Sequence, residues 1–430
     1  MDFKKQRLAI VGTGIAGMGA AHLLQHSYEI ELFEKNNYVG GHTNTVYVEE
    51  DGQQIPIDTG FMVFNKQTYP NLLNLFNQLK VPIKRTSMSF SVQHKSSQLE
   101  YCGSGFSGLF AQRKNIFNAR FIKMLLEINR FNKESLQDLL NGNLENLTVQ
   151  EYIQQKKLGK EFTDKYLVPM SSAIWSTPPD VSLKFPVKSL VHFFRNHGML
   201  GVDSHFPWYT VDGGSESYKQ LLIAPFRDKI RLNSAIKEIL SVGEQVKITT
   251  SAGKEHWFDK VIVAAHADEA LSLLSNPSKL QKKLLSQFCY QQNKAVLHSD
   301  CSVMPHNKKV WSSWNYLMDD RSGSIKTSTV YNMNSLQNVS KKQNYFVSIN
   351  PIELELKKIH KSIQYDHPIF TVEAMKAQER LPELNREGPI YFCGSYFRYG
   401  FHEDAYSSAV ELANTILKTE QKKKIKQKAG

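Results

Sequence analysis

The segment 7–34 (RLAIVGTGIAGMGAAHLLQHSYEIELFE) constrains the fold more than any other part of the chain. An apolar run over residues 8–11 precedes three glycines with the spacing GxGxxG, which are Gly12, Gly14 and Gly17. A helical pattern and a second apolar run follow. Glycines in such a turn let the backbone approach a pyrophosphate, and the N–H groups at the helix start favour its negative charge. The segment therefore predicts a βαβ unit that binds a dinucleotide.

Residues beside the glycines are expected to take part in this binding. Ile15 and Ala16 open the helix, Glu34 ends the second strand, and Lys35 follows it. A carboxylate at this distance from the turn accepts hydrogen bonds from ribose hydroxyls and repels a ribose that carries a 2′-phosphate. The unit by itself leaves open which dinucleotide is bound.

Length and composition indicate a globular protein of two closely connected domains. The chain has 430 residues, of which 41% are hydrophobic and 22% charged, so it can bury a large core. Its four cysteines show no CxxC spacing and are too sparse for a disulfide framework, which is typical of reduced cytoplasmic thiols. The histidines and carboxylates form no metal-binding pattern, so no metal is expected. There is no apolar signal region and no apolar run of roughly 18 residues, so we expect a cytoplasmic protein.

The formal net charge of +12 raises the question of an anionic partner. Residues 419–430 are expected to form a disordered basic tail, which either keeps the protein soluble or is attracted to an anionic membrane. The segment 105–131 mixes apolar and basic residues, as an interfacial helix does, although an ordinary helix that covers a core has the same pattern. Peripheral contact with the inner membrane surface is therefore an open alternative. Nucleic-acid binding is not expected, because no motif for it accompanies the charge.

The residues after the βαβ unit, VGGHTNTVYVEEDGQQIPIDTGFMVFN, decide between dinucleotides. They contain the pair Gly40-Gly41, a hairpin turn signal at Asp51-Gly52, and the segment Asp58-Thr59-Gly60. This order resembles the flavin-containing amine oxidase and phytoene desaturase superfamily. The resemblance implies that the dinucleotide is FAD.

The C-terminal block, PIYFCGSYFRYGFHEDAYSSAVELANTIL, carries the same resemblance and reads as strand, turn and helix. In the superfamily a Gly-Asp pair meets the ribityl chain here. Gly394 matches the glycine, whereas Ser395 replaces the aspartate. The helix that starts near Glu403 is expected to direct unpaired N–H groups at the flavin and to stabilise its reduced form.

The resemblance implies the remaining contacts and the fold. The residues expected to bind FAD are Gly12, Gly14, Ile15, Ala16, Gly17, Glu34, Lys35, Gly41, His42, Asp58, Gly60, Phe61, Gly394, Ser395, Glu403, Asp404 and Ala405. The expected fold is α/β, with a Rossmann-like FAD-binding domain and an inserted α+β substrate domain. The FAD-binding domain is expected from segments 1–90, 208–284 and 385–418, and the substrate domain from a helical part, 91–207, and a sheet part, 285–384, with 419–430 as the basic tail.

A narrower resemblance extends over nearly the whole chain. The runs AVLHSD, VWSSWNY, YFVSINP, YDHPIF and FCGSYFRYGFHEDA are similar to a bacterial group of amine-oxidase-like FAD proteins. Members of that group commonly accompany relatives of cyclopropane-fatty-acyl synthase, which implies lipid chemistry and a lipid-modifying partner enzyme. Ala405 departs from the group, which tends to have glycine there.

Few catalytic side chains are expected, because a flavin accepts the hydride itself. The candidates are His402 and Glu403, which lie beside the expected flavin helix. Cys393 is interpreted as a small buried hydrophobe, so FAD is expected to be non-covalent. Lys294 could correspond to the lysine near the flavin of amine oxidases, and the aromatic pair of those enzymes cannot be placed.

Three functional hypotheses follow. The first is an FAD-dependent oxidoreductase that removes a hydride from a hydrophobic, acyl-lipid substrate or uses the flavin without net oxidation. The second is an amine oxidase that uses oxygen. The third is a flavin-binding accessory protein of a lipid-modifying methyltransferase.

Overall fold

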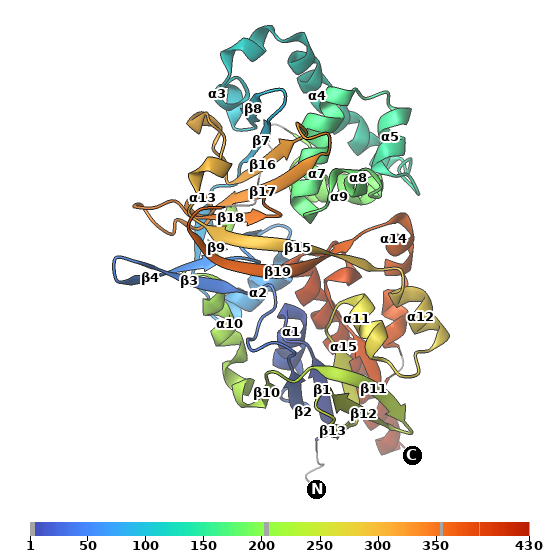
Figure 1. The fold of residues 1–430 in the computed structure, drawn as a ribbon. Coiled ribbons are helices and arrows are strands. Elements are labelled where there is room, and N and C mark those ends of the chain that lie inside the picture. Colours follow the sequence, from blue (N-terminus) through green and yellow to red (C-terminus); the bar gives the residue numbers. More distant parts are fainter. Residues whose placement is uncertain (1–4, 202–205, 353–355, 387, 430) are drawn as a thin grey trace.

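The glycine turn lies at the carboxyl end of the central strand of a five-stranded parallel sheet (Figure 1). This computed structural model describes residues 5–201, 206–352, 356–386 and 388–429; parts of the predicted segments at 1–4, 202–205, 353–355, 387 and 430 lie outside it. In the sheet order β10-β2-β1-β14-β20, the strands are Ile230–Arg231, Glu29–Phe33, Arg7–Val11, Lys260–Val263 and Ile390–Phe392. All pairings are parallel, as a Rossmann-like domain requires.

Strand β1 is apolar from Leu8 to Val11 because both faces of this sheet are covered. Leu8 and Ile10 face a core built with α1, α2, α10 and α15, whereas Ala9 and Val11 face a second core. The helices of the first core are Ile15–Leu24, Pro70–Gln78, Ser215–Ile223 and His402–Ala429. The second core includes α11 (Ala267–Leu273), α12 (Lys279–Leu285), α14 (Val372–Gln378) and the antiparallel sheet β11 (Ile236–Val242), β12 (Gln245–Thr250) and β13 (Glu255–Phe258).

The predicted hairpin after the glycine pair is confirmed. Strands β3 (Thr45–Glu50) and β4 (Gln53–Asp58) pair antiparallel from Thr45 opposite Asp58 to Glu50 opposite Gln53. The two turn residues have positive φ, 50° at Asp51 and 76° at Gly52, which suits the twist of a two-residue hairpin. A small sheet, β5 (Phe64–Asn65), β9 (Trp208–Val211) and β6 (Ile83–Thr86), then links the two domains.

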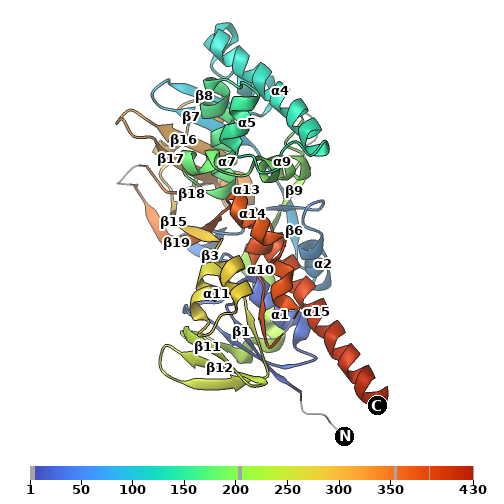
Figure 2. The ribbon, with the colours of Figure 1, turned by 90° about the vertical axis from the view of Figure 1, so that its right-hand side faces the viewer.

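The inserted domain contains a seven-stranded mixed sheet and a layer of helices. In the order β19-β15-β18-β17-β16-β7-β8, the strands are Ile359–Ile369, Cys289–His298, Phe346–Ile349, Lys326–Asn332, Trp314–Asp319, Phe90–His94 and Leu99–Cys102. The helices are α3 (Gly105–Leu109), α4 (Ala119–Leu140), α5 (Val149–Gln155), α6 (Lys160–Phe162), α7 (Val168–Trp175), α8 (Pro179–Leu183), α9 (Val187–Asn196) and α13 (Met333–Gln337). Helices α4, α5, α7 and α9 lie at the end of the molecule opposite both termini (Figures 1 and 2).

Two features differ from the sequence-based predictions. Strands β7 and β8 lie at the start of a segment predicted to be helical, because β7 joins the sheet through a parallel pairing with distant β16. The predicted boundary at residue 418 falls inside α15, which continues to Ala429 and projects from the body of the molecule (Figure 2). The basic tail is therefore a helical extension.

Candidate flavin site

The three glycines of the turn have different surroundings. Gly12 has φ +99°, and a Cβ there would lie 2.6 Å from the carbonyl oxygen of Ala264. A Cβ on Gly17 would lie 2.0 Å from the carbonyl oxygen of Gly12. A Cβ on Gly14 would meet no heavy atom within 4 Å. Close packing thus requires glycine at 12 and 17, whereas Gly14 borders open space.

The open space lies at the start of α1. Ile15 and Ala16 form the first helical turn, and Gly14, the N-cap, supplies no side chain to pair with the N–H groups of that turn. Gly41, with φ +57°, is a neighbour of Gly14: a Cβ on Gly41 would be in ordinary van der Waals contact with Gly14 Cα, at 3.5 Å. The two predicted glycine motifs are therefore adjacent and line a space with backbone donors, which fits a pyrophosphate.

Glu34 lies directly beneath the turn. Its Oε2 accepts hydrogen bonds from the N–H and hydroxyl of Thr13, at 3.1 and 2.5 Å, and its Oε1 accepts the N–H of Asn36. The carboxylate is buried, so it fixes the turn in the structure while Oε1 keeps capacity for a ribose hydroxyl. Lys35 Nζ instead pairs with Glu269 of α11 at 2.5 Å.

His42 follows the glycine pair and is stacked on an aromatic ring of the other domain. Its ring lies 4.5 Å from that of Tyr365 and 5.3 Å from that of His367, both on β19. Burial holds the pKa of His42 well below its ordinary value, and burial lowers the pKa of His367 to about 4. Nε2 of His42 is buried without a hydrogen-bond partner among the described residues, so it is free to bind a ligand.

Gly60 and Phe61 bring the next segment against His42. A Cβ on Gly60 would lie 2.3 Å from the His42 carbonyl oxygen, which accepts the N–H of Phe61 at 2.8 Å. The Phe61 ring then stacks on the ring of His402 at 4.0 Å. Residues from the first and last segments of the predicted FAD domain thus meet at one point.

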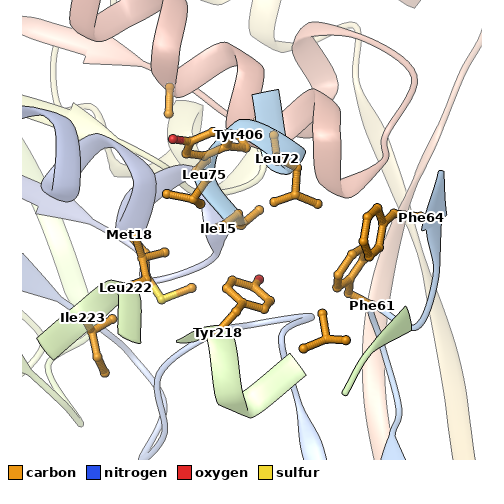
Figure 3. Close-up of a cluster of buried hydrophobic side chains, with 14 of the residues drawn as sticks. Ile15, Met18, Phe61, Phe64, Leu72, Leu75, Tyr218, Leu222, Ile223 and Tyr406 are labelled. Carbon is orange, nitrogen blue, oxygen red and sulfur yellow. The ribbon is translucent and has the colours of Figure 1, made fainter. Parts of the chain in front are cut away.

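A buried tyrosine completes this contact. The Tyr218 hydroxyl of α10 lies 2.5 Å from His402 Nε2 and 2.7 Å from the hydroxyl of Thr43. Figure 3 shows Tyr218 among the apolar side chains of α1, α2 and α10, close to Phe61. Burial lowers the pKa of His402 to about 3 and raises that of Tyr218. Both groups are neutral near pH 7.

The remaining predicted carboxylates bind helix starts. Asp58 accepts the N–H and hydroxyl of Ser215, the hydroxyl of Thr45 and the amide of Gln337, so it holds α10 to the hairpin. Burial nevertheless raises its pKa to about 6. Glu403 accepts the N–H groups of residues 71 and 72 at 3.0 and 2.8 Å, at the start of α2.

Asp404 closes the start of its own helix, α15, by accepting the N–H of Phe401 at 2.9 Å. Burial raises the pKa of Asp404 to about 7. Ala405, the next residue, lies in the first turn of α15. Both carboxylate oxygens of Glu403, the candidate for proton transfer, thus accept hydrogen bonds within the protein. The flavin contact expected from the N–H groups of this helix start stays a prediction.

The motif Cys393-Gly394-Ser395 of the C-terminal block directly follows β20. Cys393 is fully buried, and burial raises the pKa of its thiol to about 12. Gly394 donates its N–H to the Ser408 hydroxyl at 2.9 Å, and a Cβ on it would lie 2.6 Å from the Tyr396 ring. Ser395 begins a short 3-10 helix that leads toward α15. The glycine is therefore required by packing.

Sequence reasoning missed the aromatic and amide groups contributed by distant segments. These are Tyr218 beside His402, Tyr365 and His367 beside His42, and Asn293, whose Nδ2 lies 2.9 Å from His367 Nδ1. For Tyr365 and His367 the only signal was the run YDHPIF, which indicated the family resemblance but gave no indication that these residues contact His42. Lys294, the candidate amine-oxidase lysine, is exposed.

The described residues fit FAD. Gly14 borders unfilled space with helix N–H donors, and His42 offers a buried nitrogen without a partner. Within the described part of the chain, no group of three or more His, Cys, Asp or Glu side chains is arranged to hold a metal ion. None of the helices in that part has the length and apolar content to cross a membrane.

Comparisons with known proteins agree with this geometry. Residues 15–346 match the family model described as flavin containing amine oxidoreductase. Similar solved structures include wild-type putrescine oxidase bound to putrescine, with a TM-score of 0.68, 14% identity and coverage of 96% of this chain and 99% of that one. A CLA-producing fatty acid isomerase from P. acnes has a TM-score of 0.67 and 13% identity, with the same coverage. Cyclohexylamine oxidase from Brevibacterium oxydans has a TM-score of 0.64, 13% identity and the same coverage. No curated protein sequence matches the chain.

Proposed function

The chain belongs to the flavin containing amine oxidoreductase family, and from this premise we propose that this FAD-dependent oxidoreductase dehydrogenates a hydrophobic, fatty-acyl substrate. The bound flavin supplies the hydride acceptor. We infer that α1 binds the pyrophosphate through its first N–H groups, that Glu34 binds a ribose, and that His42 and Phe61 adjoin the flavin. The buried, protonated thiol of Cys393 supports non-covalent FAD.

The observation that carries the substrate proposal is the neutrality of the groups around Phe61 and His42. His42, His367 and His402 all have pKa values lowered by burial, so they carry no charge near pH 7. The nearby carboxylates of Asp58 and Glu403 are engaged with helix starts. An ammonium substrate would find no free carboxylate among these groups, whereas an apolar chain loses little on leaving water for such surroundings.

His402 is assigned a hydrogen-bonding role. With a pKa of about 3 and a bond to Tyr218, it positions the segment beside the flavin and is a weak proton acceptor at neutral pH. The fold also accommodates fatty acids in at least one relative, since a solved fatty acid isomerase shares it.

Anaerobic bleaching of the flavin tests the proposal. The purified holoenzyme is mixed, without oxygen, with fatty acids, phospholipids, putrescine or cyclohexylamine, and its visible absorbance is followed. Bleaching by an acyl lipid, with an added double bond found in the product by mass spectrometry, supports the proposal. Bleaching by the amines alone, followed by hydrogen peroxide release in air, would replace it with the amine oxidase hypothesis.

A further inference from the structure

The end of the molecule farthest from the FAD-binding domain exposes large apolar side chains. It comprises α3, the 3-10 helix Arg113–Phe117 and the first two turns of α4, within residues 105–126. Phe117 is 90% exposed, Phe106 71% and Leu126 66%, and Ile116 is also exposed. Isolated exposed apolar residues are common, but this short segment carries four of them.

The local structure explains why these side chains face outward. The Asn118 side chain accepts the N–H groups of residues 120 and 121 and so caps α4. Phe121 and Met124 then face the core, at 3% and 0% exposure. Phe117, just before the cap, and Leu126 lie off that inward stripe. Amphipathic helix packing therefore buries one face of α4 and leaves Leu126 in water beside the exposed cations Arg120 and Lys123.

The same segment is basic and contains no carboxylate. Arg113, Lys114, Arg120 and Lys123 are all exposed, and residues 105–126 include no Asp or Glu. Within the described residues, none of the four has an ion pair. The first acid along α4, Glu127, is buried and accepts the N–H of Gly159. We call the exposed residues of 106–126 the basic aromatic tip.

We propose that the basic aromatic tip docks on the surface of an anionic phospholipid bilayer. Its four unpaired cations complement lipid phosphates, and its aromatic and aliphatic side chains can enter the boundary between headgroups and acyl chains. A hollow of about 330 Å³ beside Phe117 has Lys114, Asn118 and Phe121 in its wall. Its wall also contains Glu161, whose carboxylate pairs with Lys165 at 2.5 Å, so Lys114 is the cation there that is left for a lipid phosphate. The inference is independent of the proposed substrate, since docking requires no turnover.

The test is cosedimentation of the full-length holoenzyme with vesicles. One set of vesicles is phosphatidylcholine, and the other is an equal mixture with phosphatidylglycerol. We expect binding to the mixed vesicles that weakens as salt is added. The double variant Ile116→Ser/Phe117→Ser should bind about ten-fold more weakly. The double variant Arg113→Glu/Lys114→Glu should lose the preference for anionic lipid.

Matched controls come from the antiparallel sheet β11-β12-β13 at the opposite end of the molecule (Figure 1). Trp257 of β13 is 40% exposed, and the same part of the molecule has exposed lysines at Lys237 of β11 and at Lys254 just before β13. Trp257→Ser and Lys237→Glu/Lys254→Glu change hydrophobicity and charge as the tip variants do, and both should bind as wild type. Unchanged flavin absorbance and thermal midpoint verify that each variant is folded.

Four outcomes would overturn the proposal. The first is that wild type fails to bind mixed vesicles at low salt, and the second is that both tip variants bind as wild type does. The third is that deletion of residues 419–430 abolishes binding while the tip variants still bind. The fourth is that the tip variants change their oligomeric state without any change in vesicle binding. Activity of the tip variants is also measured on a detergent-dispersed substrate. Turnover there, together with weak vesicle binding, shows that a docking defect is distinct from failure of the proposed function.

Discussion

At the scale of single residues, the contrast between Gly14 and its neighbours separates binding from folding. Because a Cβ on Gly14 would meet no heavy atom within 4 Å and its φ of −61° suits any residue, Gly14→Val should fold normally. The new side chain would occupy the space before α1, so we expect FAD affinity to fall at least about ten-fold. The measurement is flavin retained through gel filtration and released on denaturation.

The same substitution at Gly103, in the inserted domain, provides the control. A Cβ there also meets no heavy atom within 4 Å, but no predicted flavin contact lies near it in sequence. Gly103→Val should keep its flavin. Full retention of FAD by Gly14→Val would contradict the pyrophosphate site.

Tyr218 offers a second test at this scale. Tyr218→Phe removes the hydroxyl between His402 and Thr43 and leaves a buried nitrogen without that partner. We expect the free energy of unfolding to fall by about 1–3 kcal/mol. Tyr28→Phe is the control, because the buried Tyr28 hydroxyl has no partner among the described residues. Equal effects of the two variants in urea denaturation would refute a stabilising role for the Tyr218–His402 bond.

At the scale of secondary structure, the start of α15 predicts a pH dependence. Burial raises the pKa of Asp404 to about 7 in the folded protein, whereas an unfolded aspartate titrates near 4. The folded state therefore binds the proton more tightly, and this stabilising contribution, present at low pH, is lost as pH rises through 7.

Asp404→Asn removes the titrating carboxyl, so the stability of the variant no longer falls through this titration as pH rises. Between about pH 5 and pH 8, the free energy of unfolding of the variant should rise by about 2 kcal/mol relative to wild type. Denaturation of both proteins at the two pH values measures the difference. Asp268→Asn, in the first turn of α11 and exposed, should show no comparable change, and a constant gap for Asp404→Asn would contradict the buried-carboxyl account.

The secondary-structure elements also show which features could be predicted from the sequence. The βαβ unit and the hairpin at Asp51-Gly52 could be predicted because each signal is local: a glycine spacing, and two turn residues between apolar runs. The pairing of β7 with β16 could not, because those strands are far apart in the sequence and no local signal selects one as the partner of the other. The capping of α2 by Glu403 and the stacking of Tyr365 on His42 could not be predicted either, because each contact joins residues that are distant in the sequence.

At the scale of the whole molecule, the parallel sheet takes strands from three separate segments of the chain, with the inserted domain built between them. The fold class could be predicted from motifs in those segments. The contacts by which α15 holds the three segments together could not be predicted, because they involve residues of α15 that follow the C-terminal motif. Lys260 of β14, 7% exposed, places Nζ 2.9 Å from Glu420 and over the ring of Tyr28.

Two truncations test whether the end of α15 belongs to this fold. Removing residues 423–430 keeps Glu420 and should leave the free energy of unfolding unchanged within about 0.5 kcal/mol. Removing residues 419–430 leaves the buried Lys260 ammonium without its carboxylate and should cost about 1–3 kcal/mol. If the charge is the cause, Glu420→Gln in the full-length chain should reproduce most of that loss in urea denaturation. Equal stability of both truncated proteins would show that the extension is, after all, only a solvated tail.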